Sequence, residues 1–163
     1  MNEINGCERC IDENEHYLCC VNEVGDMIKR IVRNFQLVER DQIKPLGFTM
    51  TQAYCLNEIL QSSSITMQDL SIKMNLNTST MTRIVDKLVR DKYIQRFRSD
   101  SDRRIVLVKL TSEGVEAANK VQERINSYYE DITRNLPKGS IDDVLESVSL
   151  LMDAFDKSNP SCC

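Results

Sequence analysis

Residues 66–114 decide the fold, and they read TMQDLSIKMNLNTSTMTRIVDKLVRDKYIQRFRSDSDRRIVLVKLTSEG. Apolar side chains recur at helical spacing in two runs, over residues 67–74 and 81–88. A short polar turn separates the runs, and its last residue, Asn77, or the following Thr78 can cap the second helix. Two helices joined by so short a turn predict a helix-turn-helix.

A β-hairpin is expected directly after the second helix. Residues 93–98 and 105–110 are β-branched or apolar runs, and the polar cluster 99–102 between them favours a turn. Arginines lie at the base of this hairpin and just past its tip. A basic hairpin placed after a helix-turn-helix predicts a wing.

The pattern resembles the MarR (multiple-antibiotic-resistance regulator) family of winged-helix repressors. The resemblance is carried by NTSTMTRIVDKLVRDKYIQR at 77–96, DSDRR at 100–104 and VLVKLTSEG at 106–114, and it extends over roughly residues 21–155. It implies a mainly α (α+β) fold, a winged helix-turn-helix with N- and C-terminal dimerisation helices. It also implies a homodimer whose two winged helices enter successive major grooves of a pseudo-palindromic operator in double-stranded DNA.

The chain divides into segments with different expected roles. Apolar residues at helical spacing, such as Val24, Ile31 and Phe35, predict a first long helix, and a near-continuous apolar face predicts a partner for the last one. We expect dimerisation helices at 15–45 and 112–157 and the winged helix-turn-helix at 48–111. A flexible, cysteine-containing arm at 1–14 and a cysteine-containing tail at 158–163 complete the chain.

The charge of the chain is unevenly distributed. The net charge is −4, but residues 77–109 hold nine Lys and Arg against four Asp, a net +5 that leaves −9 elsewhere. A basic recognition surface on an acidic body orients a protein on DNA. No stretch is long and apolar enough to span a membrane, and the polar, acidic N-terminus does not resemble a signal peptide, so we expect a cytoplasmic protein.

The second helix of the motif combines short hydroxyls with long cations, which suit base edges and phosphates in a major groove. Arg83 and Lys87, four residues apart, also fit an ordinary solvated face, and the capped helix start and the wing favour the DNA interpretation. In the wing, the resemblance implies that Arg104 enters the minor groove while Asp102 holds its guanidinium. The predicted DNA-binding residues are Thr78, Ser79, Thr80, Thr82, Arg83, Lys87, Arg103 and Arg104.

One position departs from the family pattern. Relatives usually have Gly after the recognition helix, where a left-handed residue ends the helix at no steric cost. This chain has Lys92 there. Lys92 must either accept a strain of about 1 kcal/mol or shift the turn.

Seven cysteines are many for a chain without an export signal, and cytosolic thiols stay reduced, so a disulfide framework is not expected. Thiolate together with imidazole suits Zn(II), and thiolates alone suit softer ions such as Cu(I). A thiolate-bound metal ion is therefore a possible cofactor, reversible oxidation is a second option, and incidental cysteines are the third. The candidates are Cys7, Cys10, His16, Cys19, Cys20, Cys162 and Cys163, whereas Cys55 is expected in the core.

A small effector is also implied by the resemblance. The family's effector crevice lies between the winged helix and the dimer helices. Its candidate lining residues here are Phe35, Phe48 and Tyr54, for which core packing is the competing interpretation.

With one histidine and no Gly-rich phosphate loop, catalysis is not expected. The sequence therefore predicts a repressor released from its operator by a soft metal ion, an oxidant or an organic ligand. The alternative is a thiol-rich metal-handling or redox-sensing protein that uses the winged helix for protein contacts.

Overall fold

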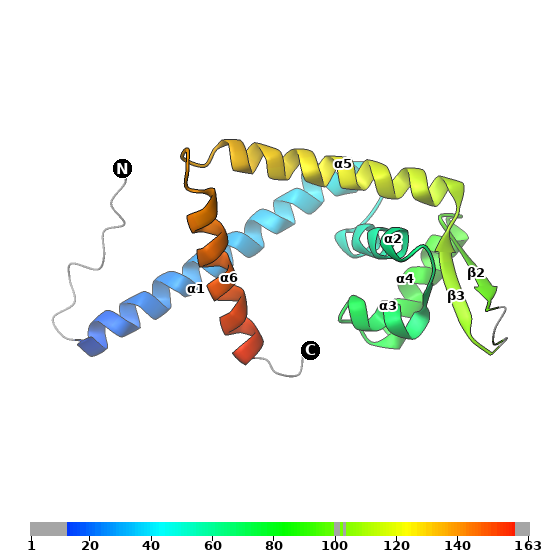
Figure 1. Ribbon diagram of the computed structural model, residues 1–163, viewed down its shortest axis with the longest axis horizontal. Helices are drawn as coiled ribbons and strands as arrows, with labels where there is room; N and C mark the ends of the chain where they lie inside the picture. Colours follow the sequence, from blue (N-terminus) through cyan, green and yellow to red (C-terminus); the bar gives the residue numbers. More distant parts are fainter. Residues whose placement is uncertain (1–12, 100–101, 103, 159–163) are drawn as a thin grey trace.

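The computed structural model describes residues 13–99, 102 and 104–158 (Figure 1). Most of this part is helical, and three short strands form its one sheet. In chain order the elements are α1 (Glu13–Val38), the π-helical turn η1 (Glu39–Ile43), the 3-10 turn η2 (Lys44–Leu46), α2 (Met50–Ser62), β1 (Ile65–Thr66), α3 (Met67–Lys73), α4 (Thr78–Arg90), β2 (Ile94–Arg98), β3 (Val106–Leu110), α5 (Ser112–Arg134) and α6 (Ile141–Ser158).

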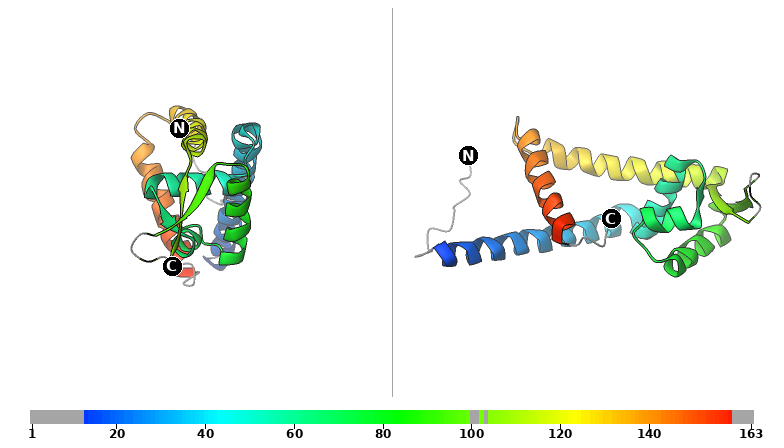
Figure 2. Two further views of the ribbon diagram at one scale, coloured as in Figure 1. Left: turned by 90° about the vertical axis from the view of Figure 1, so that its right-hand side faces the viewer. Right: turned by 60° about the horizontal axis from the view of Figure 1, so that its bottom comes forward.

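The elements form a compact lobe with long helices leading away from it. Figure 1 shows α2, α3, α4 and the sheet gathered at one end, while α1 and α5 extend from that lobe towards the other end. Figure 2 shows from a second direction that α6 turns back from the far end of α5. The predicted mainly helical winged fold, with long helices on both sides of the motif, is confirmed.

The sheet has the strand order β1-β3-β2, and both pairings are antiparallel. Ile65 of β1 lies opposite Val108 of β3, and Phe97 of β2 lies opposite Leu107. The hairpin of β2 and β3 is the predicted wing, and β1 extends it by a strand of two residues that directly precedes α3.

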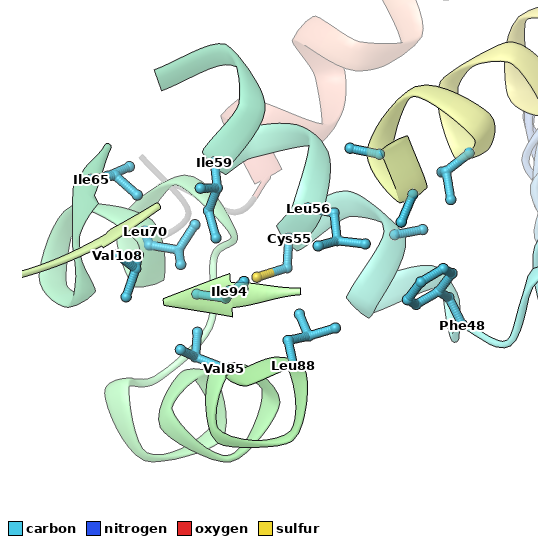
Figure 3. Packing of buried hydrophobic residues seen from close by; sticks show 14 of the residues in the cluster. Phe48, Cys55, Leu56, Ile59, Ile65, Leu70, Val85, Leu88, Ile94 and Val108 are labelled. Atoms are coloured by element: carbon cyan, nitrogen blue, oxygen red, sulfur yellow. The ribbon is translucent and has the colours of Figure 1, made fainter. Parts of the chain in front are cut away.

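A single apolar core holds the lobe together (Figure 3). Leu56 and Ile59 of α2 lie among side chains from α4 and from the strands, and α2 also contacts α5. Burying such aliphatic side chains stabilises a fold by about 1.5–3 kcal/mol each. Cys55 is completely buried in this core, as predicted. The labelled members of the core are Phe48, Cys55, Leu56, Ile59, Ile65, Leu70, Val85, Leu88, Ile94 and Val108.

The first predicted helix is shorter than expected. α1 ends at Val38, and a π turn and a 3-10 turn carry the chain to Leu46, so the predicted helix over 15–45 is corrected. Pro45 cannot donate a main-chain hydrogen bond, and Gly47 has a left-handed φ of +86°, so the α-helix cannot continue through this segment.

The long helices expose much apolar surface. α6 has no buried residue, and large side chains of α1 such as Leu18 and Met27 are each 55% exposed. Monomeric proteins rarely expose contiguous apolar surface of this extent, which instead marks an interaction site. Within residues 13–99, 102 and 104–158, no helix is both long and apolar enough to cross a membrane.

Candidate nucleic-acid interface

The start of α4 is fixed by Asn77, one of the two caps predicted. Asn77 Oδ1 accepts hydrogen bonds from the Thr80 main-chain N–H at 2.8 Å and from Ser79 Oγ at 2.7 Å. These bonds satisfy a free N–H of the first turn and define where the helix begins. Met81, Val85 and Leu88 are buried in the core, so the opposite side of α4 faces outward.

The outward side of α4 carries the predicted DNA-binding residues of this helix. Thr78, Ser79, Arg83 and Lys87 are exposed, and Thr80 and Thr82 are half-buried, so the side chains form one polar and cationic face. Lys87 Nζ lies 3.5 Å from an oxygen of Asp91, an exposed ion pair that solvent screens and that can open for a phosphate. This arrangement presents hydroxyls and cations to a ligand with negative charge.

A groove runs between α4 and the start of α2, with a volume of about 550 Å³. Three cations of α4 converge on it, together with the α2 capping residue Thr49, whose hydroxyl accepts from the Gln52 main-chain N–H at 3.3 Å. The contribution of α2 to this groove could not be predicted from sequence, because it depends on how the two helices pack. The groove is lined by Thr49, Gln52, Thr80, Arg83, Ile84, Asp86, Lys87 and Arg90.

An ion pair joins α4 to the wing. Arg96 of β2 and Asp86 of α4 approach to 2.6 Å between guanidinium nitrogen and carboxylate oxygen. Farther along the hairpin, Lys109 Nζ lies 4.9 Å from the centre of the Phe97 ring, within the range of a cation–π contact. These cross-strand and helix–strand contacts hold the wing beside the recognition helix. The pair of Asp86 with Arg96 was missed at the sequence level because the two residues belong to different elements.

The wing tip differs from the predicted arrangement. Asp102 Oδ1 accepts a hydrogen bond from the main-chain N–H of Arg104 at 2.9 Å, so the bond found here is to the main chain rather than to the guanidinium. The Asp102 carbonyl accepts from the Ile105 N–H at 2.9 Å, which closes the turn. Arg104 is exposed, and Arg103 lies outside the described residues.

The helix end at Lys92 keeps the geometry that glycine usually provides. Lys92 has a φ of +65°, so it accepts the left-handed strain instead of shifting the turn. The N–H groups of Tyr93 and Lys92 donate to the carbonyls of Leu88 and Val89 at 2.9 and 3.0 Å, the paired bonds of a Schellman helix end.

The three predicted crevice aromatics lie in different surroundings. Phe48 is buried and makes an edge-on contact with Tyr93, with ring centres 5.0 Å apart, beside a cavity of about 240 Å³. Phe35 lines a separate cavity of about 180 Å³ between α1 and α5, with Tyr128 and Tyr129 on its other side. The pKa of the half-exposed Tyr54 is raised, mainly by burial and to a lesser extent by the charge of Tyr129. Their role as effector contacts stays a prediction.

The candidate metal or redox residues are only partly within the described chain. His16 Nε2 lies 3.8 Å from Cys20 Sγ, and Cys19 is half-buried next to them. Among the residues that the structure describes, no three His, Cys, Asp or Glu side chains are gathered closely enough to hold a metal ion. Cys7, Cys10, Cys162 and Cys163 lie outside the described residues, so a site that includes them stays a prediction.

Comparison with known proteins gives a consistent result. The sequence model described as the MarR family matches residues 48–106. An HTH-type transcriptional regulator of Bacillus subtilis, YhbI, is 29% identical over 108 residues, which are 66% of this chain and 70% of that protein. The multiple antibiotic resistance protein MarR of Salmonella typhimurium is 27% identical over 114 residues, 69% of this chain and 79% of that protein.

Solved structures show the same similarity. A cysteine-to-serine mutant of MarR from E. coli, in complex with operator DNA, superposes with a TM-score of 0.67 at 26% identity and covers 82% of this chain and 96% of that one. FabT of Streptococcus pneumoniae, also in complex with DNA, superposes with a TM-score of 0.75. At 19% identity over 84% of this chain and 98% of that one, FabT supports the fold alone.

Proposed function

Because this chain belongs to the MarR family of regulators, we propose that it is a sequence-specific, DNA-binding transcriptional regulator. The observation that carries the proposal is the outward face of α4, where exposed Arg83 and Lys87 lie among hydroxyl side chains directly beside the wing. The opposite side of α4 is buried, so this face is available to a nucleic acid. We propose no catalytic role for it.

The proposed binding mode follows from groove dimensions. α4 enters the major groove, which admits an α-helix, and Arg83 reads a guanine through its O6 and N7 acceptors. Lys87 and the hydroxyls of the first turn contact neighbouring bases or phosphates. Arg104, exposed at the wing, enters the adjacent minor groove, where a narrow, electronegative channel favours a cation, and Arg103 meets phosphate.

We propose a homodimer as the DNA-binding form. The apolar side chains exposed along α1 and α6, such as Val21, Ile31, Leu145 and Met152, need a partner surface, and a second copy supplies a matching one under two-fold symmetry. Two winged helices related in this way read two half-sites of a pseudo-palindrome about one helical turn apart. The segments 15–45 and 112–157 thus serve dimerisation, and 48–111 serves DNA binding.

We propose that regulation acts at the junction between the dimerisation helices and the winged helix-turn-helix. Glu39, in the π turn after α1, accepts a hydrogen bond at 3.0 Å from the main-chain N–H of Met50, the first residue of α2. A ligand beside this junction, for example in the cavity lined by Phe48 or in that lined by Phe35, would change the separation of the two winged helices. Operator affinity then falls because both no longer fit their half-sites together, which makes the protein a repressor released by an effector.

The test is selection of duplexes from a randomised pool by the purified full-length chain. We expect enrichment of a pseudo-palindrome, and Arg83→Ala should lower affinity for it by about 1–3 kcal/mol if Arg83 reads a base. Arg134→Ala is the matched control, because Arg134 is an exposed cation paired with Glu130 and Asp131 near the far end of α5. Failure to enrich any sequence would refute the proposed specificity.

A further inference from the structure

The N-terminal part of α1 carries an imidazole and a thiol that face each other. His16 Nε2 and Cys20 Sγ lie 3.8 Å apart, and both residues are exposed. They are four positions apart, so they project from the same side of α1 on consecutive turns. Figure 1 shows this end of α1 at the opposite end of the molecule from α4, so the pair is separate from the proposed DNA-binding face.

The separation of the two donor atoms matches the requirement of a tetrahedral metal ion. Zinc binds imidazole nitrogen at about 2.0–2.1 Å and thiolate sulfur at about 2.3 Å, which places the two donor atoms about 3.5 Å apart. The observed 3.8 Å differs from this by a few tenths of an ångström, which small side-chain rotations remove. The same spacing of four residues on a helix places the two histidine ligands of known helical zinc sites.

A third donor is available on the same side of the helix. Glu23 is exposed, seven residues after His16 and three after Cys20, so at 3.6 residues per turn it lies one turn beyond the pair. Glu23 must turn towards the pair when a cation binds, because no three such side chains are gathered in the described part of the chain. An exposed side chain makes that change at little cost.

One carboxylate lies next to the pair. The charged side chains between residues 16 and 28 are Glu23 and Asp26, both acidic, and Asp26 pairs with Lys29 at 2.9 Å. Lys29 offsets the charge of Asp26, so Glu23 is the carboxylate that can turn towards the pair. Imidazole combined with one thiolate and one carboxylate suits a borderline ion such as Zn(II) better than Mg(II) or Ca(II).

We propose that His16, Cys20 and Glu23 bind one zinc-like divalent cation per chain, with water as the remaining ligand. Cys20 is assigned as the thiolate ligand because its Sγ faces His16 Nε2 at 3.8 Å. The proposal does not depend on DNA binding.

The experiment uses the full-length chain in which Cys7, Cys10, Cys162 and Cys163 are changed to Ser, so that Cys19, Cys20 and Cys55 are the remaining thiols. Co(II) is titrated as the probe, and the near-ultraviolet charge-transfer absorption from thiolate to cobalt is followed. We expect one Co(II) per chain, displacement by Zn(II), and release of about one proton as the thiol ionises. Far-ultraviolet circular dichroism shows whether each variant keeps its helices.

Three substitutions in that background decide the question. Cys20→Ser should abolish the absorption, and His16→Ala should weaken binding by about tenfold or more. Cys19→Ser is the matched control and should leave both absorption and affinity unchanged. Absorption that survives Cys20→Ser in a folded protein, or a background chain that shows no thiolate–cobalt absorption, would overturn the proposal, and neither result bears on DNA binding.

Discussion

Arg96 and Asp86 join the first strand of the wing to the recognition helix, with a guanidinium nitrogen and a carboxylate oxygen 2.6 Å apart. The side chains are 35% and 49% exposed, so solvent screens their attraction. The pair therefore contributes little to the free energy of unfolding, and its main role is to position the wing beside α4. A double-mutant cycle with Arg96→Ala and Asp86→Ala should give a coupling energy of about 0.2–1 kcal/mol in urea unfolding.

That coupling should also decrease at high salt, because exposed charges are screened. Lys29→Ala and Asp26→Ala form a comparison pair, since their ion pair lies within one helix and is more exposed still. A coupling above about 2 kcal/mol between Arg96 and Asp86 would mean that the pair is effectively buried.

Lys92 holds a left-handed conformation that favours glycine. Lys92→Gly should raise the free energy of unfolding by about 0.5–1 kcal/mol, because the left-handed strain disappears while the greater freedom of unfolded glycine offsets part of the gain. Lys92→Ala keeps the Cβ atom and the strain, so it should give no such gain. Equal stability changes for the two variants, measured by urea unfolding, would contradict this explanation.

Gly114 lies at a close approach between α5 and the chain entering β2. A Cβ atom on Gly114 would lie 2.0 Å from the Tyr93 carbonyl oxygen, a main-chain atom that cannot move aside alone. We expect Gly114→Ala to lower the free energy of unfolding by about 3 kcal/mol. Gly25→Ala, in open space within α1, should cause no loss. A Gly114→Ala variant as stable as the parent would show that α5 can shift freely at this point.

Cys55 is a buried thiol whose pKa burial raises to about 12 from an ordinary value of 9.0. The folded protein therefore holds this proton more tightly than the unfolded chain does, and stability should decrease as the pH rises from 9.0 towards about 12. Urea unfolding at neutral and at alkaline pH should show a smaller alkaline loss of stability for Cys55→Ala than for the parent.

A thiol reagent should modify exposed Cys20 in the folded protein and Cys55 only after unfolding. Rapid modification of Cys55 in the folded state would contradict the predicted burial.

Local patterns were sufficient to predict the winged helix but not the contacts between elements. The turn before α4, the Asn77 cap and the hairpin each depend on residues close in sequence, so composition and spacing identified them. The hydrogen bond from Met50 to Glu39 joins residues 11 positions apart, and the groove between α2 and α4 arises from packing. Phe35 and Phe48 line separate cavities, which could not be predicted either, because distant neighbours in the sequence determine how an aromatic side chain is buried.

The most direct test of DNA recognition by α4 and the wing is the affinity of the full-length chain for its selected duplex across a series of salt concentrations. We predict that the logarithm of the affinity falls linearly and steeply with the logarithm of the salt concentration. Each phosphate contact should contribute about −0.9 to the slope of this line. Arg83→Ala and Arg104→Ala should each weaken binding, whereas Arg134→Ala should not. An affinity that is independent of salt, or equal binding by the parent and both recognition variants, would contradict the proposed DNA interface.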